Sequence, residues 1–273
     1  FQDFALFPHL TILDNVIFGI RYDGDKKQIY DRAMNLLERV NLAKSHQKYP
    51  HMLSGGEQQR VALVRAIAPK PKVMLMDEPF SGLDNRLRDE IRDQTLSFLK
   101  EEGTAVLLVT HEPDEAMRMA DSIALMRGGT IVQEAAPYNI YNKPHDALVA
   151  SFFSDVNIIT GNVKQSRIET SFGWFITPGV EDGTSVEILI RPQHLKIDFD
   201  RNGKGPNPTS EDGVPARGKV KRARFMGKES LIEVIMDSDA SKLKVTIPGV
   251  FLPISGTPLW LSMRRDRCFV FKS

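Results

Sequence analysis

Paired cysteines, an excess of either charge and long apolar runs are all missing from this sequence. The single cysteine, Cys268, excludes an internal disulfide and is typical of a reducing compartment. We interpret it as a small apolar residue of a C-terminal strand rather than as a metal ligand or nucleophile. A formal net charge of +1 argues against a general polyanion binder. The longest apolar runs, such as 73–76 and 105–109, suit buried strands and are too short to span a membrane.

Residues 1–152 alternate between helical and strand patterns. Two segments, 31–40 and 60–68, place their apolar side chains on one face of a predicted helix. The apolar runs 73–76 and 105–109 predict parallel strands that are covered on both faces. Alternation of strands and helices in this manner indicates an α/β domain.

Residues 153–273 follow a different pattern, in which short segments of alternating apolar and polar residues are separated by Gly, Pro and Asp. The predicted strands lie at 186–190, 219–225, 230–236, 243–247, 258–263 and 268–271. The polar stretch 201–213 predicts a loop. This pattern indicates an all-β module, either a sandwich or a small barrel.

The segment LSGGEQQR at 53–60 predicts an exposed helix entrance. Ser54, followed three residues later by Glu57, forms a capping-box pattern just before an apolar-periodic helix. Gly55 and Gly56 carry no side chains that would cover the backbone N–H groups, and such an entrance suits a phosphate group. An ordinary capped helix after a loop is the alternative.

Two acidic residues, Asp77 and Glu78, follow the apolar run VMLM, at the strand end where α/β proteins place ligands. Adjacent side chains on a strand point in different directions, so these carboxylates suggest two roles: Asp77 as a ligand of Mg²⁺ and Glu78 as a general base. A solvated acidic pair is the alternative. His111 follows the second run, VLLVT, at the equivalent position, although a lone histidine is more often structural.

Together, these segments resemble the nucleotide-binding subunits of ABC transporters. The matches are LSGGEQQR at 53–60 to the family signature, VMLMDEP at 73–79 to the Walker B strand, SGLD at 81–84 to the D-loop, His111 to the switch histidine and Gln2 to the Q-loop glutamine. The resemblance covers residues 1 to about 150 and implies an α/β fold: a partial P-loop NTPase (RecA-like) core with a helical subdomain.

The β-rich region also resembles a known domain. IRPQHLKI at 190–197 and the closing strands are similar to the TOBE-type regulatory domain of importer ATPases, which implies an OB-like domain at 153–273. The segments 150–161 and 260–271 look similar to ferric-iron importer ATPases. The expected solute is therefore ferric iron, and a polyamine or another small solute is the alternative.

The resemblance implies ATP and Mg²⁺ as ligands and assigns roles to the matched residues. Glu78 is the expected catalytic base, His111 contacts the γ-phosphate, and Asp77 holds Mg²⁺. Gln2 contacts Mg²⁺ and the attacking water. The residues expected at the ATP of an opposite subunit are Ser54, Gly55, Gly56 and Gln58, with Asp84 acting across the dimer interface.

The same resemblance implies partners and a location. A second ATPase subunit, most simply a second copy of the chain, completes the dimer. Residues 7–15 lie beside the surface that receives a transmembrane permease subunit, and a solute-binding protein acts indirectly through the permease. The expected location is peripheral, at the cytoplasmic face of the membrane.

The sequence departs from the family in one respect: it contains no G-x-x-x-x-G-K-[ST] loop. In the family this Walker A loop and the aromatic residue that stacks on adenine lie upstream of the Q-loop. We therefore expect an N-terminally truncated ATPase domain that is inactive in its own site, exposes apolar edges, and belongs to an ATP-hydrolysing complete protein. A signature-only, non-catalytic partner is the alternative.

The basic segment ARGKVKRARF at 216–225 suggests a competing function, because OB-folds bind single-stranded nucleic acid through cationic grooves. Lys219 and Lys221 share a face of the predicted strand opposite Val220, and the arginines that follow break the alternation, as at a bulge. We favour a solvated strand face and expect no nucleic-acid partner.

Overall fold

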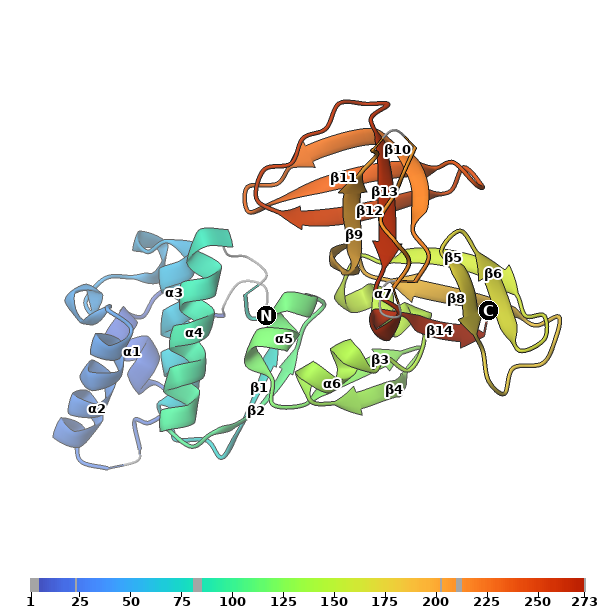
Figure 1. The fold of residues 1–273 in the computed structure, drawn as a ribbon. Coiled ribbons are helices and arrows are strands. Elements are labelled where there is room, and N and C mark those ends of the chain that lie inside the picture. The colour runs from blue at the N-terminus through green and yellow to red at the C-terminus, as the bar shows by residue number, and fades with distance from the viewer. Residues whose placement is uncertain (1–4, 23, 81–84, 202, 210–212, 273) are drawn as a thin grey trace. The chain divides into compact units, whose positions relative to one another are not determined.

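The computed structural model describes residues 5–22, 24–80, 85–201, 203–209 and 213–272. The chain divides into two compact units, residues 1–121 and 122–273. Residues 122–153 are therefore grouped with the β-rich unit in this structure (Figure 1). The predicted domain boundary after residue 152 stays a prediction. Among the described residues, no helix combines the length and the apolar character needed to cross a membrane.

The first unit joins a layer of helices to a short parallel sheet (Figure 1). Its elements are α1 (Ile12–Ile17), α2 (Lys26–Arg39), the 3-10 turns Ala43–Ser45 and Pro50–Met52, α3 (Gly55–Ile67), β1 (Val73–Asp77), α4 (Asn85–Glu101), β2 (Ala105–Val109) and α5 (Pro113–Met119). β1 and β2 pair in parallel, with Val73 opposite Ala105 and Asp77 opposite Val109. Their carboxyl ends therefore lie side by side.

The predicted helical faces form the core of this unit. Side chains on one face of α2 and of α3 are buried, namely Ile29, Ala33, Leu36, Leu37, Val61, Val64 and Ile67. The fully buried side chain of Asn15 braces the segment before α1, because its amide accepts the Phe7 N–H at 2.8 Å and donates to the carbonyls of Phe7, Leu10 and Thr11. The Asn15 side chain thus braces the segment that we expect beside a permease.

The prediction that β1 and β2 are covered on both faces is wrong for the described chain. Met74 is buried in the helical core, but Val73 and Leu75 are 60% and 74% exposed. On β2, Leu107 and Val109 are 60% and 54% exposed. Successive side chains of a strand point to opposite faces, and the described residues of this unit cover only the face that carries Met74.

The second unit is built mainly from antiparallel strands. It begins with the hairpin of β3 (Ile123–Arg127) and β4 (Thr130–Ala135), at the Gly128-Gly129 pair typical of such turns, and continues with α6 (Pro137–Asn142) and α7 (Ala147–Phe153). A three-stranded sheet, β14-β8-β5, contains β5 (Asn157–Asn162), β8 (Ser185–Ile190) and β14 (Phe269–Lys272). A second hairpin pairs β6 (Arg167–Thr170) with β7 (Gly173–Ile176).

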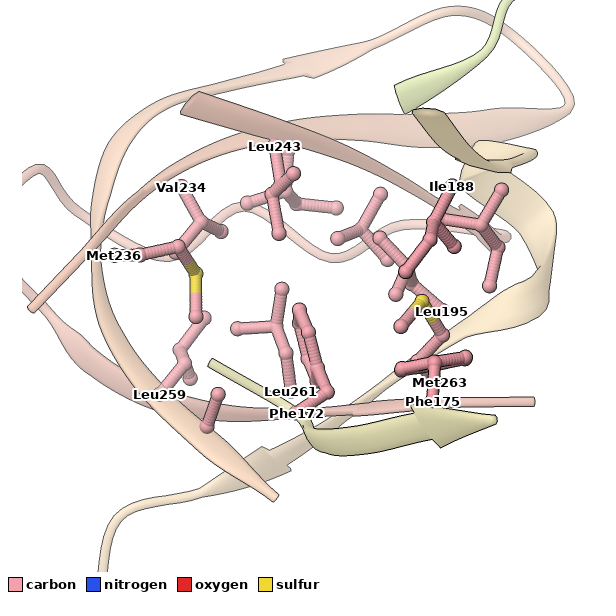
Figure 2. Packing of buried hydrophobic residues seen from close by; sticks show 14 of the residues in the cluster. Phe172, Phe175, Ile188, Leu195, Val234, Met236, Leu243, Leu259, Leu261 and Met263 are labelled. Atoms are coloured by element: carbon pink, nitrogen blue, oxygen red, sulfur yellow. The ribbon is translucent and has the colours of Figure 1, made fainter. Parts of the chain in front are cut away.

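A five-stranded antiparallel sheet completes this unit in the order β12-β11-β10-β13-β9. Its strands are β9 (Leu195–Phe199), β10 (Ala216–Phe225), β11 (Glu229–Met236), β12 (Lys242–Pro248) and β13 (Pro258–Met263), with 3-10 turns at Pro192–His194 and Arg265–Arg267. The sheet curls around a core of alternate side chains, including Val234, Leu243 and Leu261 (Figure 2). This curled sheet agrees with the predicted OB-like fold.

The edge of β12 is tied to the three-stranded sheet by a side chain. Asn157 of β5 accepts the backbone N–H of Lys244 at 2.7 Å and donates to its carbonyl at 2.8 Å. A side-chain amide thus supplies both hydrogen bonds that another strand would give at this position. The contact joins the two sheets into one unit.

The six predicted β segments all contain strands of the structure, and the register of β10 and β11 shifts between Val220 and Arg222, where the broken alternation predicts a bulge. The predicted loop at 201–213 contains only isolated bridges in its described part. Among the described strands of residues 153–273, four were not predicted from the sequence, namely β5, β6, β7 and β9.

We predict that Asp146 stabilises the second unit as the N-cap of α7. Its carboxylate accepts the Val149 N–H at 2.9 Å and pairs with Arg127 at 2.7 Å, and the hydrogen bond from Arg127 lowers the pKa of Asp146 to about 2. Asp146→Ala should reduce the free energy of unfolding by about 1–2 kcal/mol in urea titrations.

The matched control is Asp146→Asn, which keeps a capping acceptor and loses the charge, and should cost less than the alanine variant. Because the pKa of Asp146 is lowered by folding, its contribution is complete above about pH 4 and is lost as the pH falls toward 2. Equal stability of the wild-type and alanine proteins at pH 6 would contradict the assignment.

Candidate functional site

The predicted base and the predicted switch histidine lie together at the carboxyl ends of β1 and β2. Glu78 directly follows β1, and its backbone N–H donates to the carbonyl of Val109 at 2.8 Å. The side chains then meet, with 2.7 Å between Nδ1 of His111 and Oε1 of Glu78. Parallel pairing in this register therefore brings a carboxylate and an imidazole, 33 residues apart in the chain, into one hydrogen bond.

The backbone of Glu78 adopts an uncommon conformation, with a φ of +44°. A side chain in this left-handed region costs roughly 1–3 kcal/mol unless the surroundings hold it. The next residues supply such support: the Pro79 carbonyl accepts a hydrogen bond from the Gln59 side chain, and the Phe80 ring is 2% exposed. The turn that presents Glu78 is therefore anchored immediately after the strained residue.

The charge of His111 depends on its acidic neighbours. The hydrogen bond with Glu78 raises the pKa of His111 above its usual value, and the negative charges of Glu78, Glu112 and Glu115 act in the same direction. Both members of the pair are accessible, with side-chain exposures of 63% for His111 and 43% for Glu78. An accessible carboxylate held by an imidazole can accept a proton from a water molecule.

Asp77 is the last residue of β1 and is exposed. No group of three or more His, Cys, Asp or Glu side chains arranged for a metal was found among the described residues. Mg²⁺ in phosphoryl-transfer sites is held by one or two carboxylates, and water and substrate phosphates complete the octahedron. A single exposed carboxylate at a strand end fits that mode. Gln2, the other predicted Mg²⁺ contact, lies outside the described residues.

The predicted capping box at the signature helix α3 is confirmed. The hydroxyl oxygen of Ser54 accepts the Glu57 N–H at 3.4 Å, and the Glu57 carboxylate accepts the Ser54 N–H at 2.8 Å. The Ser54 hydroxyl also donates to the Glu57 carboxylate at 2.8 Å, and the backbone and side-chain hydrogen bonds from Ser54 to this carboxylate lower the pKa of Glu57. Ser54 and Gly55 are exposed and Gly56 is buried, and a Cβ added to Gly55 would meet no atom within 4 Å. The entrance of α3 is open to a ligand, as the phosphate hypothesis requires.

The other predicted nucleotide contacts differ in their surroundings. The amide nitrogen of Gln58 donates to the carbonyls of Pro50 at 3.0 Å and Leu53 at 3.2 Å, so this side chain braces the loop before the signature. Asp84 lies outside the described residues. The roles assigned to these two residues stay predictions.

Three buried polar residues around the site were not predicted from the sequence. Gln59 is 6% exposed, Arg92 of α4 is 5% exposed and Glu115 of α5 is 2% exposed. Gln59 lies inside the signature segment and next to Gln58, and this position in the sequence could have indicated a functional role. Nothing in the sequence indicates that Arg92 and Glu115 are buried, because charged residues of a helix are normally solvated.

Cys268 lies one residue before β14, within the usual uncertainty of a strand boundary. Burial raises the pKa of its thiol to about 12, and Sγ donates to the carbonyl of Arg264 at 3.3 Å. A thiol that stays protonated at neutral pH is a poor nucleophile and metal ligand. The interpretation of Cys268 as a structural residue agrees with this environment.

We predict that Glu78→Gln lowers the pKa of His111 toward about 6.5, its ordinary value. The change removes the negative partner whose hydrogen bond is the main cause of the raised pKa. NMR titration of labelled histidine, with the resonance assigned through His111→Asn, measures the shift. Glu112→Gln is the matched control, because Glu112 lies 3.9 Å from Nε2 of His111 and should have a smaller effect. A His111 pKa that is unchanged by Glu78→Gln would exclude the pair.

Two family models match parts of this chain. The family model of the ABC transporter matches residues 1–81, and that of the TOBE domain matches residues 188–271. A solved dimeric ATP-binding cassette, bound to ADP and Pi in a post-hydrolysis state, is 32% identical, with a TM-score of 0.44 over 50% of this chain and 61% of that chain.

Curated relatives match most of this chain. The spermidine/putrescine import ATP-binding protein PotA of Vibrio vulnificus is 38% identical over 244 residues, which are 85% of this chain and 63% of that protein. The Fe(3+) ions import ATP-binding protein FbpC of Pseudomonas fluorescens is 34% identical over 266 residues, or 96% of this chain and 73% of that protein. The chain thus spans about two thirds of the length of these relatives. It belongs to the family of ABC transporter ATP-binding proteins with a TOBE domain.

Proposed function

We propose that the complete protein is the ATP-hydrolysing subunit of an ABC importer, with Glu78 as the catalytic base. The observation that carries this proposal is the hydrogen bond between Glu78 and His111 at the ends of two parallel strands. This edge of a sheet is where α/β proteins bind their ligands. The strained, anchored turn at Glu78 adds support, because such conformations cluster at functional sites.

In this proposal, the Glu78 carboxylate accepts the proton of the water that attacks the γ-phosphate. His111 orients the carboxylate through Nδ1, and the imidazole lies beside the position where phosphate charge is expected. Asp77 holds Mg²⁺, which neutralises phosphate charge when it is bound. Gln2 orients the attacking water. Catalysis of this kind relies on positioning more than on covalent chemistry.

The signature segment 53–60 contacts the ATP that a second subunit holds. Ser54, Gly55 and Gly56 offer the open entrance of α3 to ATP held by the partner, and a helix N-terminus favours a negative ligand. Gln58 and Asp84 act at the same interface. The simplest partner is a second copy of the chain, so that two ATP molecules are enclosed in one symmetric dimer.

The remaining assignments concern the assembly. Residues 1–152 form part of the ABC domain and residues 153–273 the TOBE-type regulatory domain. The braced segment 7–15 contacts a transmembrane permease at the cytoplasmic face of the membrane, and a solute-binding protein delivers the solute to that permease. The hydrogen bonds of Asn15 support a fixed docking surface.

The test of the base uses the complete subunit. Glu78→Gln keeps the size of the side chain and removes its capacity to accept a proton, so ATP turnover should fall by a factor of about 10² or more. ATP binding, measured by equilibrium titration, should be retained. Glu112→Gln is the control and should hydrolyse ATP at nearly the normal rate. Unimpaired turnover of Glu78→Gln would refute the assignment, and a wild-type subunit without turnover would favour a non-catalytic partner.

For the solute, we propose ferric iron. The alignment with the iron import protein covers 96% of this chain, against 85% for the spermidine/putrescine import protein, and the segments 150–161 and 260–271 suggest the iron class. The second candidate is a polyamine, which is favoured by the higher identity, 38%, of the spermidine/putrescine import protein. Both solutes are cations, so charge alone does not separate them.

Uptake of radiolabelled ferric iron and of radiolabelled spermidine by cells that carry the complete transporter separates the two candidates. We expect Glu78→Gln to abolish iron uptake and to leave spermidine uptake unchanged. If Glu78→Gln abolishes only spermidine uptake, the transported solute is a polyamine and the proposal of ferric iron is wrong. Glu112→Gln again serves as the control and should support normal uptake.

A further inference from the structure

Two buried charges of opposite sign lie between α4 and α5, and the proposed mechanism of hydrolysis assigns no role to them. Arg92 of α4 is 5% exposed and Glu115 of α5 is 2% exposed. Nε of Arg92 lies 3.4 Å from Oε1 of Glu115. Charged side chains are almost never buried to this extent unless they are paired. The pair therefore requires an explanation.

Arg92 contacts both chain segments that carry the reacting pair. Its guanidinium carbon lies 5.8 Å from the centre of the Phe80 ring, and Phe80 follows Glu78 by two residues. Its partner Glu115 lies in the first turn of α5, four residues after His111. One guanidinium thus connects the turn after Glu78 to the helix after His111.

Two further contacts tighten the same connection. Met119, at the end of α5, packs against the buried ring of Phe80. The side chain of Gln59, from α3, donates to the carbonyl of Pro79, which lies between Glu78 and Phe80. The turn at Glu78 is therefore fixed from α3, α4 and α5 together.

Stability alone does not account for the buried pair. Desolvation of two charges usually cancels their attraction, so a hydrophobic pair of similar size is often as stable or more stable. The same two helices are also joined at the surface, where Arg118 pairs with Asp89 at 3.1 Å and with Asp93 at 2.7 Å. A second bridge is not needed merely to hold α5 against α4.

We propose that Arg92, together with Glu115, is a positioning residue that sets the Glu78 carboxylate against the His111 imidazole for hydrolysis. The proposal rests on the proposed function, because it gives the buried pair a role in the same reaction. In this role Arg92 contacts neither ATP nor the attacking water. It acts by fixing the distance between the two segments that end in Glu78 and His111.

A double-mutant cycle tests the positioning directly. The His111 pKa is measured by NMR in the wild-type chain, in Glu78→Gln, in Arg92→Met/Glu115→Leu, and in the triple variant. If the buried pair positions Glu78, the Glu78→Gln substitution should lower the pKa in the wild-type background and have almost no effect in the Arg92→Met/Glu115→Leu background. The direct effect of the Glu115 charge on His111 cancels in this cycle, because the two proteins compared within each background carry the same residue at position 115. An equal effect of Glu78→Gln in both backgrounds would overturn the proposal.

The second readout is turnover in the complete subunit. Arg92→Met/Glu115→Leu should lower kcat about ten- to a hundredfold, since small displacements of a catalytic group have effects of this size. KM for ATP and the midpoint of urea unfolding should stay close to the wild-type values. The matched control, Arg118→Gln, removes the exposed bridge between the same helices and should leave kcat and the His111 pKa unchanged. An equal loss of kcat in Arg118→Gln would show that any link between α4 and α5 suffices, and would overturn the role of the buried pair.

A second variant covers the case in which the hydrophobic replacement does not fold. Arg92→Lys keeps the positive charge near Glu115 but lacks the planar group that also reaches Phe80. It should fold, and it should reduce the effect of Glu78→Gln on the His111 pKa. An unchanged effect would again overturn the proposal. Because the titration needs no ATP, its outcome is separate from that of the hydrolysis test of Glu78.

Discussion

The parallel pairing of β1 with β2 is the constraint on which the candidate site depends. Asp77 lies opposite Val109, and this register places the residues that follow each strand, Glu78 and then His111, at one edge. A shift of one residue would turn the side chains of one strand to the other face. The 2.7 Å contact of Glu78 with His111 would then be lost. The chemistry of the site therefore depends on backbone hydrogen bonds that carry no catalytic group.

Local features of the site could be predicted from the sequence, because the residues responsible are neighbours in the chain. The capping box of Ser54 and Glu57 spans three residues, and the buried faces of α2 and α3 follow helical periodicity. The contacts of Arg92 with Phe80 and Glu115 join α4 to α5 and to the turn after β1, and no local pattern encodes them. Strands β5, β6, β7 and β9 were missed for a similar reason, since short strands acquire their identity from their partners.

The exposed face of β1 and β2 shows that an apolar run can predict the backbone conformation of a strand correctly and the burial of that strand incorrectly. The apolar runs correctly predict two strands, because their residues favour an extended backbone. Burial on both faces is a further inference about neighbouring elements, and among the described residues only the face of Met74 has such cover. Strand formation and strand burial are separate predictions, and one apolar run does not support both equally.

Two energetically unfavourable features of the structure lie close to Glu78. The positive φ of that residue and the burial of the Arg92–Glu115 pair are each unfavourable in isolation. Such costs persist only where surrounding contacts over-determine the structure, and here α3, α4 and α5 all contact the turn or its supports. A fold optimised for stability alone would replace the buried charges with apolar side chains. Their presence next to a carboxylate–imidazole pair is better explained by geometry: a charged pair fixes the distance between two segments in a way that deformable apolar side chains do not.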